Sequence, residues 1–428
     1  MWRLGACALL LATAVNFLLP TEPVMAATFS VTTTADSGSG SLRQAITDAN
    51  AAAGADTVTF AGGVTGTITL ASDLPEIADD LTVTGPGQLV LTIDGAGLYR
   101  PFWIRAGKSF TITDLTLKRG RNVYERGSLI HNQQGAVSAT DVTFRDDTGH
   151  AAVYNLSGGS VATYTRCKFL NNSTAVGGDH GTTPSTTSST ESDYTNRTYI
   201  VDSIFENNNY GISQERFTKI TGSTFRNNSY AAYIGGLNRS QILTSTFEIN
   251  GTALGFGNWT PTSWTGVGAN NRYINGNTFS QNTTTFQLND SWDDGHRSQR
   301  WTTITNNTWD GTGTWISASE WDGSTNASIT KTDVNSTGVA WTESGNVNSL
   351  AVPSTTAAPA VVAPPAETST TTSPTSFAPV SSTVAAVLPM VAIEELPSTG
   401  SSETNAMLGI GLLALAASVL ATRKRVVK

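Results

Sequence analysis

Residues 292–297 hold the strongest candidate for catalysis in the chain. Two adjacent carboxylates, Asp293 and Asp294, are followed after one glycine by the imidazole of His296 and the guanidinium of Arg297. Glycoside hydrolysis uses two carboxyl groups, about 5–5.5 Å apart in retaining enzymes and about 6.5–9.5 Å apart in inverting ones. Carboxylates on adjacent turns, or two residues apart on one strand, could reach such a separation, whereas neighbouring residues on a strand point to opposite faces. The alternative interpretation is a solvated loop.

Tryptophan is concentrated in the same part of the sequence, because eight of the ten tryptophans lie between residues 259 and 341. Trp259, Trp264 and Trp292 stand in polar segments, and an aromatic face beside polar side chains suits a sugar ring. We therefore expect these three residues to form a ligand face for carbohydrate. The alternative is that the tryptophans cover the open C-terminal end of the fold.

Metal or cofactor chemistry has no support in the sequence. The chain has four histidines, and no two of them have the spacing of metal ligands. Loop carboxylates are suitable ligands for Ca²⁺, but no motif supports such a site. We expect neither a metal nor a cofactor.

A repeated phrase of one aromatic residue and two asparagines organises the region that must position these groups. Successive aromatic residues are 25, 36, 20, 22, 32 and 30 residues apart, and periods of this length mark solenoids. Apolar and polar residues alternate within each unit, which predicts strands. The units begin at Phe144, Phe169, Phe205, Phe225, Phe247, Phe279 and Trp309.

These repeats predict a parallel β-helix over residues 61–350. Asparagine tolerates the left-handed backbone of a tight corner, and its side chain can hydrogen-bond from turn to turn while the aromatic rings stack inside. Val83 and Leu117 are expected to take the aromatic position in the first turns. The same alignment assigns Asp146 and Asp147 to a corner rather than to a catalytic site, and it places the insertions of the later turns on one side. The alternatives are a β-sandwich and a propeller, whose blade repeats are longer and lack a recurring asparagine corner.

Residues 1–26 have the pattern of a secretory signal peptide, with a basic start, an apolar core and a small-residue cleavage site between Ala26 and Ala27. A strand and a short helix are expected in residues 27–60. One helix ahead of a solenoid is suited to cover the end of the coil.

The expected helix begins with a capping-box pattern at Ser41 and Gln44, in which the Gln44 side chain is expected to reach back to the helix N-terminus. Gly54 is a natural stop. The apolar positions fall at helical spacing and make one stripe: Leu42, Ala45, Ile46 and Ala49.

The segment 29–95 resembles the N-terminal part of secreted bacterial right-handed parallel β-helix proteins. It contains Gly-Ser-Leu-Arg-Gln-Ala-Ile where those proteins often carry Cys-Ser-Leu-Arg-Glu-Ala, so that Gly40 replaces the cysteine and Gln44 the glutamate. The resemblance implies a right-handed coil and a surface location. It implies no catalytic residues, because the family is defined by its fold.

Residues 351–395 hold seven of the 15 prolines with many Thr, Ser and Ala, which predicts a disordered, extended stalk. Residues 396–428 then join a pentapeptide to an apolar segment at 406–421 and a basic tail. This order resembles the cell-wall sorting signal of Gram-positive surface proteins. The pentapeptide consists of Leu396, Pro397, Ser398, Thr399 and Gly400.

The resemblance to sorting signals implies that a sortase attacks the Thr399 carbonyl, releases the chain from Gly400 onward and joins Thr399 to peptidoglycan. We therefore expect a secreted protein that is covalently anchored to the Gram-positive cell wall. The apolar segment is near the lower limit for spanning a bilayer as a transmembrane helix, so the alternative is a single-span membrane protein that keeps residues 400–428.

Composition limits the partners. Residues 27–399 carry 20 bases and 31 acids, a net charge of −11, which argues against nucleic acid or an anionic membrane as partner. Cys167 is the single cysteine after the leader, so no internal disulfide forms. We expect a monomer.

The sequence favours an adhesin-like, wall-anchored β-helix whose loop face binds carbohydrate or another surface. A wall-anchored polysaccharide lyase or glycoside hydrolase is the alternative, and a purely structural surface component is a third.

Overall fold

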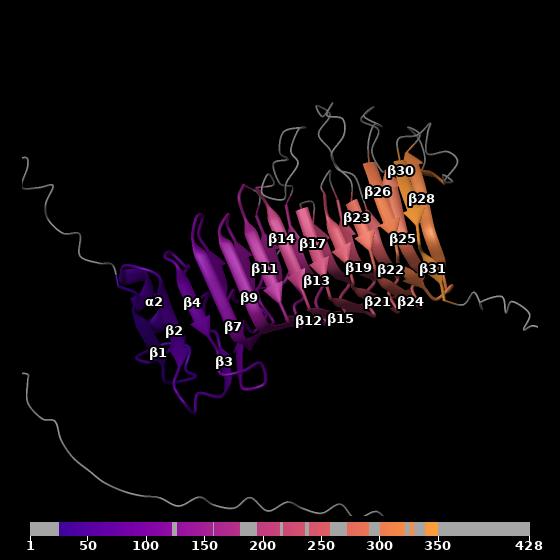
Figure 1. Ribbon diagram of the computed structural model, residues 1–428. Coiled ribbons are helices and arrows are strands. Elements are labelled where there is room, and N and C mark those ends of the chain that lie inside the picture. The colour runs from indigo at the N-terminus through magenta and orange to yellow at the C-terminus, as the bar shows by residue number, and fades with distance from the viewer. Residues whose placement is uncertain are drawn as a thin grey trace, which may run out of the picture. The chain divides into compact units, whose positions relative to one another are not determined.

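The computed structural model describes the repetitive part of the chain (Figure 1). The described residues are 25–121, 126–156, 158–179, 195–214, 217–235, 239–256, 272–290, 300–321, 326–328 and 339–349. The leader up to residue 24, the stalk predicted for residues 351–395 and the sorting signal at 396–428 lie outside these ranges.

Successive turns of the chain add strands to the same three faces, and neighbouring turns pair in parallel. Two faces belong to a 21-stranded sheet, and the third face is a 10-stranded sheet. β29 departs from this pattern, because it pairs antiparallel with β28. The predicted fold class, an all-β coil of parallel strands, is confirmed.

The three faces consist of the following strands. The first face contains β1 (Thr28–Val31), β2 (Asp56–Phe60), β4 (Leu81–Thr84), β11 (Val161–Thr165), β14 (Arg197–Val201), β17 (Phe217–Thr221), β20 (Gln241–Leu243), β23 (Arg272–Asn275), β26 (Arg300–Thr305) and β30 (Val339–Ser344). The second face contains β3 (Gly66–Thr69), β5 (Leu91–Asp94), β12 (Lys168–Leu170), β15 (Ile204–Glu206), β18 (Thr224–Arg226), β21 (Thr246–Glu248), β24 (Thr278–Ser280), β27 (Thr308–Trp309) and β31 (Val347–Asn348). The third face contains β6 (Phe102–Ile104), β8 (Ile130–Asn132), β10 (Val153–Asn155), β13 (Thr174–Gly178), β16 (Tyr210–Gln214), β19 (Tyr230–Ile234), β22 (Thr252–Phe256), β25 (Thr284–Asp290), β28 (Thr314–Trp321) and β29 (Asn326–Ser328). Two long strands, β7 (Ser109–Lys118) and β9 (Ala136–Arg145), run through both the first and the second face.

The corner between the second and third faces is made by the first residue of each paired asparagine. Asn171, Asn207 and Asn227 have φ angles of 57°, 58° and 53°, the left-handed conformation that asparagine adopts more readily than most residues. Asp146 has the same conformation, with φ of 55°. The assignment of Asp146 and Asp147 to a corner therefore agrees with the structure.

The second residue of each pair is buried and forms a ladder of amides along the coil. Each Nδ2 donates to Oδ1 of the asparagine in the next turn at 2.9–3.0 Å. The same oxygen accepts the backbone N–H of the preceding asparagine. This ladder satisfies polar groups that would otherwise be costly to bury. It runs through Asn172, Asn208, Asn228, Asn250 and Asn282.

The aromatic residues stack inside the coil, as expected. Ring centroids from Phe144 to Phe279 are 4.5–5.1 Å apart, and the planes of neighbouring rings differ by 7–14°. Leu117 occupies the position of Phe144 in the preceding turn, as predicted. The prediction for Val83 is wrong: this residue pairs with Ile112 on the first face, and Ile93 takes the position next to Leu117.

The helix α2 (Leu42–Ala51) lies at the end of the coil where β1 is the outermost strand (Figure 1). All four residues of its predicted apolar stripe are buried, and the backbone N–H of Gln44 donates to the N-cap hydroxyl of Ser41 at 3.2 Å. The prediction that the Gln44 side chain bonds to the helix N-terminus is wrong, because the Ser41 N–H already donates to the carbonyl oxygen of Gly38. Gln44 instead donates to Asp48 at 2.7 Å.

Ala27, the first residue after the predicted cleavage site, is held by a buried carboxylate. Its backbone nitrogen donates to Oδ1 of Asp56 at 2.7 Å, and Asp56 is 1% exposed. The second oxygen, Oδ2, is buried without a hydrogen-bond partner among the described residues. Such a carboxylate is suited to a cation with several protons.

Removal of the leader before Ala27 would place an ammonium group at this nitrogen. We predict that acetylating Ala27 in the cleaved chain lowers the free energy of unfolding by about 1 kcal/mol, because the acetylated nitrogen keeps one N–H for Asp56 but loses its charge, and charge roughly doubles a hydrogen bond of about 1 kcal/mol. Denaturant titration measures the difference. Acetylation should cost little in an Asp56→Asn chain, and an equal loss in both chains would contradict the prediction.

Candidate functional site

The loop-borne candidates belong to segments that leave one edge of the third face. Residues 257–271 follow the end of β22, and residues 291–299 follow the end of β25; each leads to a strand of the first face. Both segments lie outside the described residues. The predictions that fall on them therefore remain predictions: Trp259, Trp264, Trp292, Asp293, Asp294, His296 and Arg297.

Three tryptophans near the C-terminal end of the coil, Trp309, Trp315 and Trp341, pack in or against its interior. The rings of Trp309 and Trp315 are 5.1 Å apart, and Trp315 packs edge-on against Phe286 at 4.9 Å. Trp341 is buried. For these three residues the structure agrees with the covering role that was the alternative to a ligand face.

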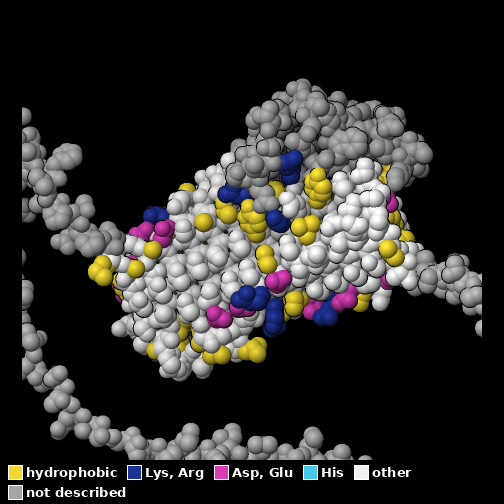
Figure 2. Space-filling view, viewed as in Figure 1, with side chains coloured by type: hydrophobic (Ala, Val, Ile, Leu, Met, Phe, Trp, Pro, Cys, Tyr) yellow, Lys and Arg dark blue, Asp and Glu magenta, His cyan; other side chains and the backbone are white. Residues whose placement is uncertain are grey.

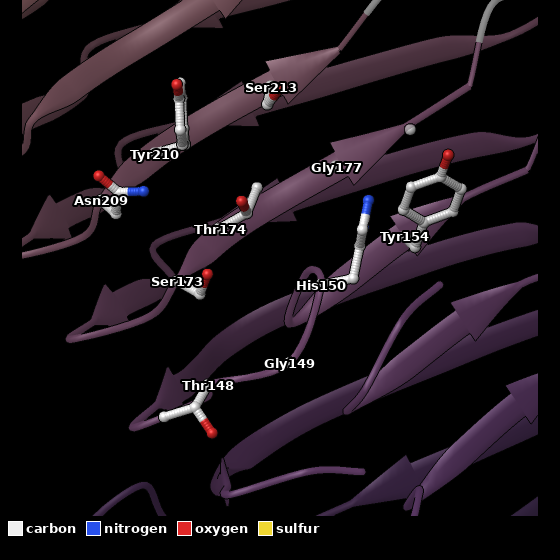
Figure 3. Close-up of a pocket in the computed structure, with 11 residues that line it drawn as sticks. Thr148, Gly149, His150, Tyr154, Ser173, Thr174, Gly177, Asn209, Tyr210 and Ser213 are labelled. Atoms are coloured by element: carbon white, nitrogen blue, oxygen red, sulfur yellow. The ribbon is translucent and has the colours of Figure 1, made fainter. Parts of the chain in front are cut away.

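A groove on the outside of the third face is the site that the described residues do form (Figure 3). It encloses about 570 Å³ and is lined from three successive turns by β10, β13, β16 and the loops that precede them. The lining combines two tyrosines and a histidine with hydroxyl and amide groups. It consists of Thr148, Gly149, His150, Tyr154, Ser173, Thr174, Gly177, Gly178, Asn209, Tyr210 and Ser213.

Gly177 lies in the floor of this groove, where the absence of a side chain lets the Tyr154 ring pack close to the strand. Parallel pairing places it in line between Tyr154 of β10 and Ser213 of β16. A Cβ atom at this position would lie 2.9 Å from Cβ of Ala151 and 3.1 Å from Cδ2 of Tyr154. A larger residue would therefore crowd the Tyr154 ring and fill the space above the strand.

Aromatic rings stand at both ends of the groove. His150 meets Tyr154 edge to face at 5.6 Å, and Tyr210 stacks on Tyr230 of the next turn at 4.9 Å with 9° between the planes. The first contact lies within one turn, whereas the second fixes the orientation of the Tyr210 ring from the neighbouring turn. The rings, with the hydroxyl groups between them, give a surface that is apolar on its faces and hydrogen-bonding at its edges.

The charged groups nearest the groove are paired with each other. The Tyr154 hydroxyl and the Arg126 guanidinium both donate to the Asp179 carboxylate. The Arg126 guanidinium also lies 5.4 Å from the centre of the Tyr154 ring. Asp179 is thereby engaged in holding Tyr154 in place, at the end of β13 where the next insertion begins.

An aromatic pair continues the third face toward the N-terminus. Trp103 and His131 meet edge to face at 5.0 Å, and Nδ1 of His131 lies 2.7 Å from the Arg126 carbonyl oxygen. Burial lowers the pKa of His131, so this imidazole is neutral near pH 7 and its Nδ1–H donates to that carbonyl.

Asp147 stands at the head of the asparagine ladder and directly precedes the groove loop. Its backbone N–H donates to Oδ1 of Asn172 at 3.1 Å. Oγ of Ser128 lies 2.5 Å from Oδ2 of Asp147 and 2.8 Å from the Ala151 carbonyl oxygen. One hydroxyl proton cannot serve two acceptors, but a protonated Asp147 that donates to Ser128 satisfies both contacts. Burial raises the pKa of Asp147 to about 6, against the opposing hydrogen bond from Ser128.

The chemical groups of the described groove lining are one imidazole, two phenols, hydroxyl groups and an amide. Its described lining contains no carboxylate, whereas glycoside hydrolysis needs two. Within the described ranges there is also no cluster of three or more His, Cys, Asp or Glu residues that could hold a metal.

Sequence reasoning missed this groove because it searched the insertions. The available signal was the third strand of each repeat, where Tyr210 and Tyr230 recur at the same offset after the asparagine pair.

Comparison with known proteins identifies the C-terminus. A family model described as the LPXTG cell wall anchor motif matches residues 392–427. The search of curated proteins found no match.

Solved structures with a similar course of the chain include three proteins at 12% identity. ORF18 of Geobacillus virus E2 has a TM-score of 0.38 over 73% of this chain, which spans 64% of that protein's length. The catalytic domain of a GH87 α-1,3-glucanase in complex with tetrasaccharides has a TM-score of 0.36, and the catalytic unit of the thermostable GH87 α-1,3-glucanase from Streptomyces thermodiastaticus strain HF3-3 has one of 0.33; each match covers 77% of this chain and 70% of the other. Similarities this low bear on neither the activity nor the ligand of this chain.

The anchor motif makes the chain a secreted protein that is covalently attached to the cell wall of a Gram-positive bacterium. It implies processing by a sortase and attachment to peptidoglycan. In the part of the chain that the structure describes, no helix has both the length and the apolar character needed to cross a membrane. The apolar segment predicted at 406–421 lies outside that part.

Replacing the acid at the head of the ladder tests its protonation. The Asp147 pKa is raised from 3.8 to about 6, so the folded state binds the proton more tightly, and stability falls as pH rises through this interval. We predict that Asp147→Asn stabilises the chain by up to about 3 kcal/mol at pH 8, because one pKa unit corresponds to about 1.4 kcal/mol. At pH 4 the effect should be small.

Thermal unfolding at both pH values measures the Asp147 effect. Asp146→Asn is the matched control, since Asp146 pairs with Arg145 at the surface at 2.7 Å. If Asp147→Asn changed stability equally at pH 4 and pH 8, the prediction that folded Asp147 binds its proton more tightly would be wrong.

Proposed function

We propose that this wall-anchored protein binds carbohydrate through the groove on the third face and acts as an adhesin-like surface protein. The observation that carries the proposal is the combination of the His150 and Tyr210 rings with hydroxyl and amide groups around a floor made by Gly177 and the buried ring of Tyr154. Sugar rings offer apolar faces and a rim of hydroxyl groups, and such a surface matches both. The resemblance of residues 29–95 to secreted β-helix proteins supports display at the surface.

A binding role fits the charges better than a catalytic one. Asp179, a carboxylate beside the groove, accepts hydrogen bonds from Tyr154 and Arg126, and the described lining itself contains no carboxylate. The lyase or hydrolase alternative depends on Asp293, Asp294, His296 and Arg297, which the structure does not describe. No described contact favours it.

Anchoring to the wall determines where the groove is presented. In the proposed arrangement a sortase joins Thr399 to peptidoglycan, and the stalk at residues 351–395 separates the coil from the wall. An extended stalk of this composition covers about 3.1 Å per residue. The coil would thus meet polysaccharide or another surface beyond the wall to which it is attached.

Filling the groove tests the binding site. We predict that Gly177→Leu weakens binding to glycans about tenfold or more on a glycan array, because the new side chain occupies the floor and displaces Tyr154. Gly62→Leu is the control, since a Cβ at Gly62 meets nothing within 4 Å. A reducing-sugar release assay runs alongside. Binding that is unchanged in Gly177→Leu would overturn the proposed site, and sugar release would favour the enzyme.

Attachment has a separate test. The proposed transfer breaks the bond after Thr399, so we predict that Thr399→Ala leaves the chain in the membrane fraction, while Ser398→Ala, at the variable position of the motif, still reaches the wall. Fractionation of cells after digestion of the wall measures both. Equal wall attachment of the Thr399→Ala chain would refute sortase transfer at this residue.

A further inference from the structure

Two rows of residues on the outer side of the third-face strands continue the groove, and within them the side chains of Tyr154 and Thr252 are buried. Parallel pairing aligns one residue from each successive strand, from β10 to β25 in the first row and from β13 to β25 in the second. We call these two rows the third-face track. The first row is Tyr154, Gly177, Ser213, Tyr233, Gly255 and Gln287, and the second is Thr174, Tyr210, Tyr230, Thr252 and Thr284.

The track contains no charged residue in either of its described rows. The second face differs, because its corresponding outward row contains Lys118, Arg145, Glu206, Arg226 and Glu248. In that row Arg226 lies 2.8 Å from Glu206 and 3.7 Å from Glu248. Basic and acidic side chains lie side by side along the lower edge of the coil in Figure 2. The uncharged track is therefore a property of one face and not of the whole surface.

Aromatic rings recur along the track beyond the groove. Tyr154 stands on β10, while Tyr210 and Tyr230 are stacked across β16 and β19. Tyr233, also on β19, packs over Gly255, where a Cβ would lie 2.8 Å from its Cδ2. Strands are spaced about 4.8 Å apart, so Tyr233 lies about 14 Å along the coil from Tyr154.

We propose that the third-face track binds an extended, uncharged polysaccharide chain that lies along the coil axis and crosses successive strands. This inference rests on the proposed carbohydrate binding in the groove and extends it to the class and orientation of the ligand. Rings at intervals suit stacking on successive sugars, and the hydroxyl and amide groups between them suit hydrogen bonds to sugar hydroxyls.

The charged pair beside the track disfavours binding of an acidic polysaccharide. The basic group beside the groove, Arg126, is paired with Asp179 and lies over Tyr154. An acidic chain would have to compete with this pair and would meet the negative charge of Asp179. A neutral chain leaves the pair intact.

The length of the track predicts how affinity depends on ligand length. Five strand spacings from β10 to β25 amount to about 24 Å, which is several sugar units. Affinity should therefore rise with each added sugar until the track is filled, whereas a ligand confined to the groove would reach its full affinity as a disaccharide.

The experiment measures binding of neutral oligosaccharides of two to six units to the full-length chain by calorimetry. The probes are β-1,4-glucan, β-1,3-glucan and β-1,4-N-acetylglucosamine series, with oligogalacturonate as the acidic probe, at low and high salt. We expect one neutral series to gain about tenfold or more in affinity from the dimer to the hexamer, with little dependence on salt. Oligogalacturonate should bind more weakly than that series at both salt concentrations.

Variants beyond the groove locate the chain on the track. Tyr233→Ala and Gly255→Leu should weaken binding of the hexamer severalfold and leave the dimer unchanged. Tyr273→Ala is the matched control, because Tyr273 is a 43% exposed tyrosine on the first face. Three results would each contradict binding along the track. They are full affinity already with the dimer, hexamer binding that Tyr233→Ala does not change, and tighter, salt-dependent binding of oligogalacturonate.

The failure of the track differs from the failure of the groove. In one outcome, Gly177→Leu abolishes binding of the dimer, while Tyr233→Ala and a longer oligosaccharide leave the affinity unchanged. That outcome would support binding in the groove and contradict binding along the track. Absence of binding to every glycan would remove both.

Discussion

Burial of one amide in each turn from Asn172 to Asn282 is the constraint on which the rest of this coil depends. Each asparagine of the ladder donates to the next asparagine and to a backbone carbonyl, as Asn208 does toward Asn228 and Phe169 at 2.9 and 3.0 Å. A buried amide without such partners costs several times the net gain of about 1 kcal/mol from a satisfied hydrogen bond. A turn that slips by one residue would leave amides unpaired in both neighbouring turns. The ladder therefore stabilises one register strongly against its alternatives.

A fixed register also determines what the outside of the coil can present. Because Phe205 stacks on Phe225 and Asn208 bonds Asn228, the residue two or five places after the second asparagine meets its counterpart in the next turn. Tyr210 and Tyr230 are such a pair. A chemical feature repeated in sequence thus becomes a row in space, and turns of different length still align because the insertions leave at the end of the third face. The scaffold tolerates insertions of many lengths while the proposed binding surface stays continuous.

Sequence periodicity predicted the inside of this protein better than the outside. The Phe and Asn positions repeat and are held by packing, so strands, corners and stacked rings follow from them, as does the corner at Asp146. Val83 was misplaced because aliphatic residues of the first turns occur on every face and carry no distinguishing spacing. The groove escaped prediction because it depends on a missing side chain at Gly177 and on pairing between Tyr154, Asp179 and Arg126, residues 25 and 53 positions apart. Long-range contacts of this kind leave no local pattern.

Asp147 shows how the inside and the outside of the coil are connected. It occupies the ladder position that asparagine fills in later turns, and its backbone N–H donates to the Asn172 side chain as the asparagines of the ladder do. Its side chain, however, turns to Ser128 and Ala151 through a single hydroxyl, and the next three residues line the groove. An asparagine there would continue the buried ladder, whereas an acid ends it and links it to the loop beside Tyr154. The first turn of the ladder therefore also forms one wall of the proposed binding site. The stacked amides that hold the turns in register thus also fix one end of the groove.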